Sequence, residues 1–235
     1  MKQLTTLYVT KSMNNKTNQT IGQLVRQLNL YRSELLILLL FIFYTVGTVG
    51  ILLPETREQF LSLSFFNLIL SFSILLFGRK EHSLQTYVFI VCCFMTGMTV
   101  EWIGIHTGWL FGNYYYGENL GFKWLGVPLV IGINWSMLVF TSGSFFAQTS
   151  WKPWLKALAS ATLMTGLDVL MEPVAMKSDF WHWSNNTIPL FNYTCWFFIS
   201  WALLWIGFYF NRIESNKVSK ALFILLAVFF TLLNC

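Results

Sequence analysis

Three carboxylic acids lie within long apolar runs of the sequence, where a charged side chain is costly. Glu101 falls near the end of one run, and Asp168 and Glu172 fall near the end of another. Charged residues inside membrane-spanning segments usually face the protein interior and mark functional sites. Asp168 and Glu172 are four residues apart on one helix face, where two negative charges repel, so we expect one of them to hold a proton. A carboxylic acid that is protonated near neutral pH can act as a general acid. The alternative is that one or more of these acids only makes interhelical hydrogen bonds or lies in the solvated interface.

The composition is that of an integral membrane protein. Of the 235 residues, 55% are hydrophobic, 18% are aromatic and only 11% are charged. The high hydrophobic content excludes a disordered chain. The net charge of +5 comes from scattered Lys and Arg, which argues against a nucleic-acid partner. The four cysteines have neither CxxC nor zinc-site spacing, so redox and metal–thiolate chemistry are not expected.

The chain contains seven apolar runs of about the length that a helix needs to cross a bilayer. They are residues 34–53, 59–77, 86–105, 124–146, 154–174, 191–210 and 219–234. We therefore expect an all-α fold, a polytopic transmembrane helix bundle with about seven spans. The last run is short and the second carries several Ser and an Asn, so either could instead form a half-buried or interfacial helix.

Residues 34–235 are predicted to form a single transmembrane domain, and residues 1–33 a cytoplasmic tail. Apolar positions between residues 21 and 31 recur at helical spacing, which predicts an amphipathic helix that lies on the membrane surface. Most Lys and Arg fall in the tail and in the connections on one side, so the amino terminus should be cytoplasmic. We expect a multi-pass protein of the bacterial cytoplasmic membrane, with all three acids toward the outer side.

Small residues share the helix face of Glu101, at intervals of three or four. They are Gly97, Gly104 and Gly108. Such a stripe lets a neighbouring helix approach closely and would turn Glu101 into the bundle.

Aromatic residues crowd the two connections, residues 106–123 and 175–190, that follow the acid-bearing runs. Trp and Tyr collect at membrane interfaces, so an aromatic belt would explain most of them. The alternative is a cavity for a long apolar polyene, in which ring faces stabilise a transient carbocation. The glycines interleaved with the aromatics of the first connection favour a tightly folded re-entrant loop.

The sequence lacks the characteristic residues of several other classes of membrane protein. The three His are too few for a membrane di-iron enzyme, and the last run has no central Lys for a retinal Schiff base. Asp168 and Glu172 resemble one acidic motif of a membrane prenyltransferase, but a second is missing. The chain has no dinucleotide fingerprint and no P-loop, so we expect no cofactor and no metal.

The motifs around these acids resemble the CruF-type carotenoid biosynthesis family over about residues 97–200. In the first half the resemblance rests on Glu101-Trp-Ile-Gly104, Thr107-Gly108, Phe111-Gly112, Tyr114 and Tyr116, Gly126-Val-Pro128 and Asn134-Trp135. In the second half it rests on Asp168-Val-Leu-Met-Glu172-Pro173, Trp181-His-Trp183, Pro189, Asn192 and Trp196. The family pattern has Asp-Pro where this chain has Glu172-Pro173, which places the carboxyl one methylene farther out.

The resemblance implies a cofactor-independent hydro-lyase, a carotenoid hydratase that adds water to the terminal 1,2 double bond of an acyclic ψ-end of a lycopene- or γ-carotene-like isoprenoid. Asp168 would donate the proton, Glu101 would orient or deprotonate water, and Glu172 would tune Asp168, although these roles could be permuted. The residues expected to bind substrate are Trp102, Thr107, Trp109, Phe111, Tyr114, Tyr116, Asn134, Trp135, Trp181, Trp183, Asn192 and Trp196.

Other functions remain open on these residues. A carbocation can lose a proton as well as capture water, which would give a carotenoid cyclase or isomerase. A non-enzymatic carotenoid- or lipid-binding subunit could use the same aromatic cavity, and an acid-coupled transporter could use the same acids. The expected partners are the lipid bilayer, the polyene and other carotenoid-pathway enzymes. A polyene must enter from the bilayer, so we also expect a lateral gap between helices.

Overall fold

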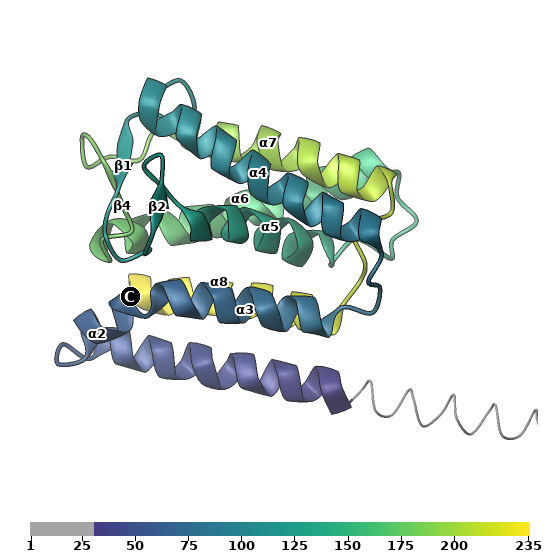
Figure 1. The fold of residues 1–235 in the computed structure, drawn as a ribbon, viewed down its shortest axis with the longest axis horizontal. Coiled ribbons are helices and arrows are strands. Elements are labelled where there is room, and N and C mark those ends of the chain that lie inside the picture. Colours follow the sequence, from purple (N-terminus) through teal and green to yellow (C-terminus); the bar gives the residue numbers. More distant parts are fainter. Residues whose placement is uncertain (1–30) are drawn as a thin grey trace, which may run out of the picture.

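The computed structural model describes residues 31–235 as a layered helix bundle (Figure 1). Its helices are Tyr31–Leu52, α2 (Arg57–Ser62), α3 (Ser64–Gly78), α4 (Leu84–Thr107), α5 (Leu129–Gly143), α6 (Pro153–Lys177), α7 (Leu190–Tyr209) and α8 (Lys217–Asn234). The all-α polytopic membrane fold is confirmed. The amphipathic helix predicted over residues 21–31 lies outside the described residues, apart from its last position.

Each of the seven apolar runs contains a helix, but the helices differ in length. Within residues 31–235, five are long and apolar enough to cross a membrane: Tyr31–Leu52, α4, α6, α7 and α8. The last run, expected to be short, is one of these five. The second run is divided at Leu63 into α2 and α3, and the fourth is helical only over α5, because residues 124–128 belong to a hairpin. At 15 residues each, α3 and α5 extend only about 22 Å.

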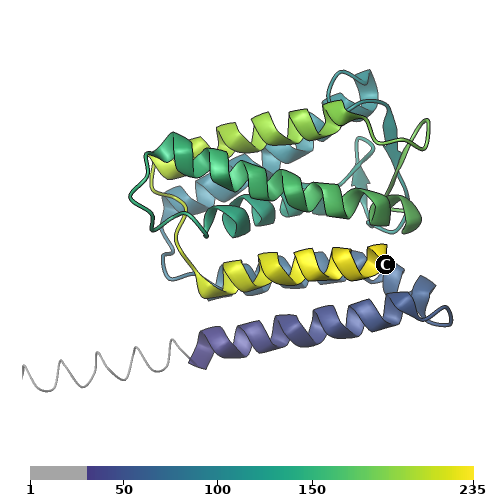
Figure 2. The same ribbon diagram turned by 180° about the vertical axis from the view of Figure 1, so that it is seen from behind.

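The short helix α5 lies at the centre of the bundle. Almost all of its residues are buried, and it contacts α3, α4, α6, α7 and α8. In Figures 1 and 2, α4 and α7 form one outer layer, α5 and α6 the next, and α3 and α8 a third, with Tyr31–Leu52 beyond them. A helix that is enclosed by protein need not match the thickness of the bilayer, which explains why α5 can be short.

The glycine stripe on α4 admits large aromatic side chains. A Cβ atom on Gly97 would lie 2.6 Å from the indole of Trp135 on α5, and one on Gly104 would lie 2.6 Å from the Tyr114 hydroxyl. Gly108 is instead the residue at which α4 ends, with a left-handed φ of +66°. The stripe therefore turns Glu101 into the bundle, as predicted, and brings two hydrogen-bond donors toward it.

Two short strands close one end of the bundle. Strand β1 (Tyr114–Tyr116) pairs antiparallel with β4 (Trp181–Trp183), with Tyr114 opposite Trp183 and Tyr116 opposite Trp181. A separate β-hairpin is formed by β2 (Lys123–Trp124) and β3 (Val127–Pro128). Side chains alternate across a strand, so the outer residues of each triplet face the bundle and the middle ones face away. The aromatic connections thus form a β-ribbon, which the sequence analysis did not predict.

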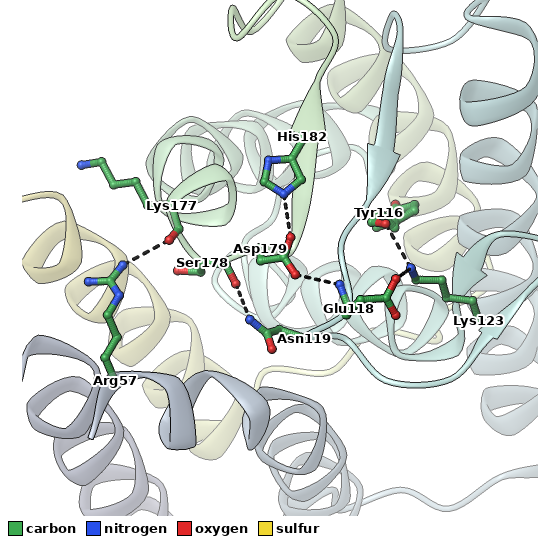
Figure 3. A network of polar contacts seen from close by, with 9 residues as sticks. All are labelled: Arg57, Tyr116, Glu118, Asn119, Lys123, Lys177, Ser178, Asp179 and His182. Carbon is green, nitrogen blue, oxygen red and sulfur yellow. Dashed lines mark hydrogen bonds and ion pairs between the residues drawn. The ribbon is translucent and has the colours of Figure 1, made fainter. Parts of the chain in front are cut away.

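A network of polar contacts fastens the ribbon to the helix ends (Figure 3). The Asp179 carboxylate accepts hydrogen bonds from the His182 ring at 2.7 Å and from the Glu118 amide at 2.9 Å. These two contacts, the His182 bond first, hold the pKa of Asp179 below its ordinary value.

The same network reaches α2 and the hairpin. Arg57 donates to the carbonyl of Lys177 at 3.2 Å, and Asn119 donates to that of Ser178 at 2.9 Å. The Lys123 ammonium pairs with Glu118 at 2.8 Å and donates to the carbonyl of Tyr116 at 3.1 Å (Figure 3). The ribbon is thereby tied to the end of α6 and to the β2–β3 hairpin, and α2 is tied to the same end of α6.

Gly97→Ala should destabilise the protein by about 1–3 kcal/mol, because the added methyl group overpacks the fully buried Trp135. Gly166→Ala is the matched control, since a Cβ on this α6 glycine meets nothing within 4 Å. Thermal unfolding of both variants in detergent measures the difference. Equal melting temperatures for the two would contradict the packing described for α4 and α5.

Candidate active site

Glu101 lies buried on α4 and accepts three hydrogen bonds from side chains. The hydroxyls of Tyr114 and Tyr116 donate to its Oε2 at 2.5 and 2.7 Å, and the indole of Trp135 donates to its Oε1 at 3.0 Å. An ionised carboxylate only accepts hydrogen bonds, so three donors match that form. Two donors come from the ribbon and one from α5, which fixes Glu101 between three parts of the fold.

The two tyrosine hydroxyls act as donors because they keep their protons. Burial, and after it the charge of Glu101, holds the pKa of Tyr114 and of Tyr116 well above the ordinary value of a tyrosine. Both side chains are buried, whereas the intervening Tyr115 faces outward.

Glu172 on α6 has an equivalent set of three donors. The indoles of Trp181 and Trp183 donate to its Oε2 at 2.9 and 2.8 Å, and the Asn192 amide donates to its Oε1 at 2.9 Å. Both tryptophans stand on β4, so each strand of the ribbon serves one glutamate. The two tyrosines of β1 lie opposite the two tryptophans of β4, so all four donors stand on one face of the ribbon.

Asp168 lies one turn before Glu172 and is fully buried. The same Asn192 nitrogen that bonds Glu172 also donates to Asp168 Oδ2 at 3.1 Å. Oδ1 of Asp168 has no hydrogen-bond partner. Asn192 therefore holds the two carboxyl groups close together, and Asp168 has the fewest donors of the three acids.

Among the residues that the structure describes, no basic side chain forms an ion pair with the three acids. The ion pairs found within residues 31–235, Lys123 with Glu118 and His182 with Asp179, lie at the ribbon and its loops. Three buried negative charges without a cation would be very costly, so we infer that the cluster retains at least one proton. Asp168, with one donor and a bare oxygen, is the best place for it.

A small cavity with a mixed polar and aromatic lining lies between Glu101 and Glu172, and we call it the acid cavity. Its volume is about 20 Å³, which is room for about one water molecule. It is lined by Glu101, Phe111, Tyr114, Tyr116, Ile131, Asn134, Glu172, Trp181, Trp183, Asn192 and Trp196. The indole of Trp196 stacks on Trp135, with ring centroids 4.2 Å apart. The acid cavity thus joins two carboxylates, aromatic faces and space for a water.

Most of the residues predicted for the site come together here. Asp168 and Trp135 do not line the cavity but bond directly to residues that do. Of the residues that line it, the sequence analysis missed Ile131, an apolar residue among many in a buried helix that carried no distinguishing signal.

Three residues predicted to bind substrate lie elsewhere. Trp102 is 41% exposed on another face of α4 and packs against His106. Thr107 bonds the carbonyl of Ile103 at the helix end, and Trp109 is 83% exposed. Each residue along a helix turns by about 100°, so Trp102 points away from the face that Glu101 shares with Gly97 and Gly104. An aromatic belt at the membrane surface accounts for Trp102 and Trp109.

Comparison with known proteins finds one family. The family model described as "Carotenoid biosynthesis protein" matches residues 60–234, which include α3 to α8, the ribbon and all three acids. Neither the search of curated proteins nor that of solved structures gave a match.

Tyr116→Phe should lower the stability of the folded protein by about 1–3 kcal/mol, because it removes one of the donors that compensate the buried Glu101 carboxylate. Tyr115→Phe makes the same chemical change on the outward face of β1 and should leave stability unchanged. Thermal unfolding of the two variants side by side tests this difference. A Tyr116 variant as stable as the Tyr115 variant would show that the ribbon hydroxyl does not stabilise the acid.

Proposed function

The chain belongs to the carotenoid biosynthesis protein family, and on that premise we propose that it is a carotenoid hydratase. It adds water across the terminal 1,2 double bond of an acyclic ψ-end, as in lycopene or γ-carotene, and forms a tertiary alcohol without a cofactor. The protein is a multi-pass integral membrane protein. We assign it to the bacterial cytoplasmic membrane, with the amino terminus in the cytoplasm and other enzymes of the pathway as neighbours.

The observation that carries this proposal is the acid cavity. Hydration of an isolated double bond needs a proton donor, a base and one positioned water within a site that tolerates a carbocation. The cavity has room for about one water between two carboxylates, and its remaining wall is largely aromatic. Asn134, Tyr114 and Tyr116 add polar groups from which a water can be held.

The reaction begins with protonation of C2. The proton goes to C2 with the π electrons of the C1–C2 double bond, which leaves a tertiary cation at C1. Trp181, Trp183 and Tyr114 form part of the cavity wall, so their rings can stabilise a cation that forms beside the water. The oxygen of the water then bonds to C1 and loses a proton to Glu101. The acid is restored when that proton returns, so one molecule of water is added in each cycle.

The pair formed by Asp168 and Glu172 supplies the first proton. Asp168 has the fewest donors and so holds the proton best, whereas Glu172 faces the cavity. Asn192 bonds both carboxyl groups and keeps them together. We therefore assign Asp168 as the group that stores the proton and Glu172 as the group through which it reaches the substrate, a division of roles that the sequence alone had left open.

Water capture is favoured over the alternatives by the same geometry. A cyclase or isomerase needs no water beside its carbocation, and a binding subunit needs no proton at all. A subunit that only presented carotenoid would retain its function in acid variants that still fold, so the acid variants discriminate between these functions.

Asp168→Asn should lower the formation of hydrated carotenoid by at least about a hundredfold, the usual contribution of a general acid. The protein is expressed in a bacterium that accumulates lycopene, and the extracted pigments are separated and weighed by mass spectrometry. Glu101→Gln should have a similar effect. Glu58→Gln is the matched control, because Glu58 is exposed on α2 and lies outside the acid cavity.

Full conversion by a folded Asp168→Asn protein would contradict the assignment of the acid. Conversion of lycopene to an isomer or a ring of unchanged mass by the unaltered protein would instead favour the cyclase or isomerase.

A further inference from the structure

Two apolar cavities lie next to each other on one side of the acid cavity, and the first of them adjoins it. The first, which we call the inner cavity, has a volume of about 60 Å³ and lies among α3, α5, α6, α8 and Tyr44 of the helix Tyr31–Leu52. The second, which we call the lateral cavity, has a volume of about 620 Å³ and lies between the helix Tyr31–Leu52 and α3. Apart from a few Ser, Asn and Tyr side chains and one Gly, both are lined by aliphatic and aromatic residues.

The three cavities are adjacent, because neighbouring ones share wall residues. The acid cavity and the inner cavity share Ile131, Asn134 and Trp181. The inner cavity and the lateral cavity share Ser64, Asn67 and Phe229. The three hollows therefore form one series that leads from the helix Tyr31–Leu52 to Glu101 and Glu172.

The exposed fraction of the wall residues falls from the lateral cavity to the inner cavity. Phe43, Val46 and Phe66 of the lateral cavity are 44%, 51% and 63% exposed on the sides of membrane helices. Leu138 and Leu226 of the inner cavity are buried. The lateral cavity thus opens sideways toward lipid, as expected for a protein whose substrate arrives from the bilayer, while the inner end is enclosed.

A free polar group stands at the inner end of the series. Asn134 is 7% exposed and lines both the acid cavity and the inner cavity. Within the part of the chain that the structure describes, its amide has no hydrogen-bond partner, in contrast to Asn192. Because this amide stands in the walls of two cavities and has no partner in the described protein, a ligand or a water can bond it there. Asn134 therefore marks the point where an apolar ligand meets a polar reactant.

We propose that the three cavities form the binding path of an acyclic isoprenoid chain, which enters from the bilayer between the helix Tyr31–Leu52 and α3. The proposal rests on the proposed function, which it deepens by assigning the route and the binding site. The chain fills the lateral and inner cavities, and its end stops at Asn134. The Asn134 amide holds the water before the reaction and the new tertiary hydroxyl after it.

The shape and chemistry of the path select this occupant. Water does not fill hollows lined by Phe, Leu and Ile, whereas an apolar chain gains by filling them. The inner cavity, at about 60 Å³, is far smaller than the lateral cavity, at about 620 Å³, which favours the end of a slender chain over a ring. A phospholipid acyl chain is also slender, but it has no double bond for the acids to protonate at its end.

Gly47→Phe tests the path, because Gly47 lines the lateral cavity and its Cβ would only touch Phe229 at 4.0 Å. The new ring has room in the lateral cavity, so folding is preserved while the path is filled. Gly166→Phe is the matched control, an exposed glycine of α6 with open space around it. Ser64→Phe fills the path from α3, at the wall shared by the inner and lateral cavities.

Two quantities are measured for the full chain in lycopene-accumulating cells. The first is the conversion of lycopene, and the second is the lycopene that co-purifies when each variant also carries Asp168→Asn to stop turnover. We expect both Gly47→Phe and Ser64→Phe to lower both quantities by at least about tenfold relative to Gly166→Phe, because even one methylene of misfit in an apolar pocket costs about tenfold. Melting temperatures establish that each compared variant is folded.

Different results would contradict the proposed binding path and the proposed hydratase reaction. Lycopene that co-purifies with the unaltered protein and is lost in the two filled variants, with no hydrated product from any of them, would support the path and contradict the hydratase. Equal retention and equal conversion in the filled variants and the Gly166 control would overturn the path, whatever the reaction is.

Discussion

Three carboxyl groups are buried at one end of a membrane helix bundle without a basic partner among residues 31–235, and the surrounding structure must compensate their charge. Their compensation must come from neutral hydrogen-bond donors, and the fold supplies seven such bonds from indoles, phenols and one amide. Four of the donors stand on the β-ribbon, which can present them only while the network around Asp179 holds it against the helix ends. The same need for close donors explains the glycines at positions 97 and 104, where any side chain would keep Trp135 and Tyr114 away from Glu101.

Much of this could be predicted from the sequence, because the signals are local. A run of apolar residues long enough for the bilayer predicts a helix wherever it occurs, and an acid inside such a run predicts a buried functional group. The spacing of Glu101 and the glycines along one face of a helix predicts which face turns inward. The motifs around Glu101, Asp168 and Glu172 indicated the carotenoid biosynthesis family, which the family match over residues 60–234 confirms.

The remainder depends on contacts between residues far apart in the chain. The pairing of β1 with β4 joins segments separated by more than sixty residues, and the sequence analysis had predicted a re-entrant loop for the first of them. The resemblance and the aromatic connection suggested Trp102, Thr107 and Trp109 as substrate-binding residues, but the phase of α4 and the end of the helix turn them away from the acid cavity. The shortness of α5 and the cavity beside the helix Tyr31–Leu52 follow from how helices pack, which hydropathy does not encode. The Asn67 and Ser64 side chains that made the second run look half-buried line that path.

The most direct test of the account is the origin of the oxygen in the product. The full chain is reconstituted in lipid bilayers with lycopene, in water enriched in heavy oxygen and without added cofactor or metal, and the pigments are analysed by mass spectrometry. A carotenoid heavier by one water, with the heavy oxygen in its hydroxyl, is the result that the acid cavity predicts. Unchanged lycopene, from protein that is folded and has bound the pigment, would contradict the claim that these three acids add water.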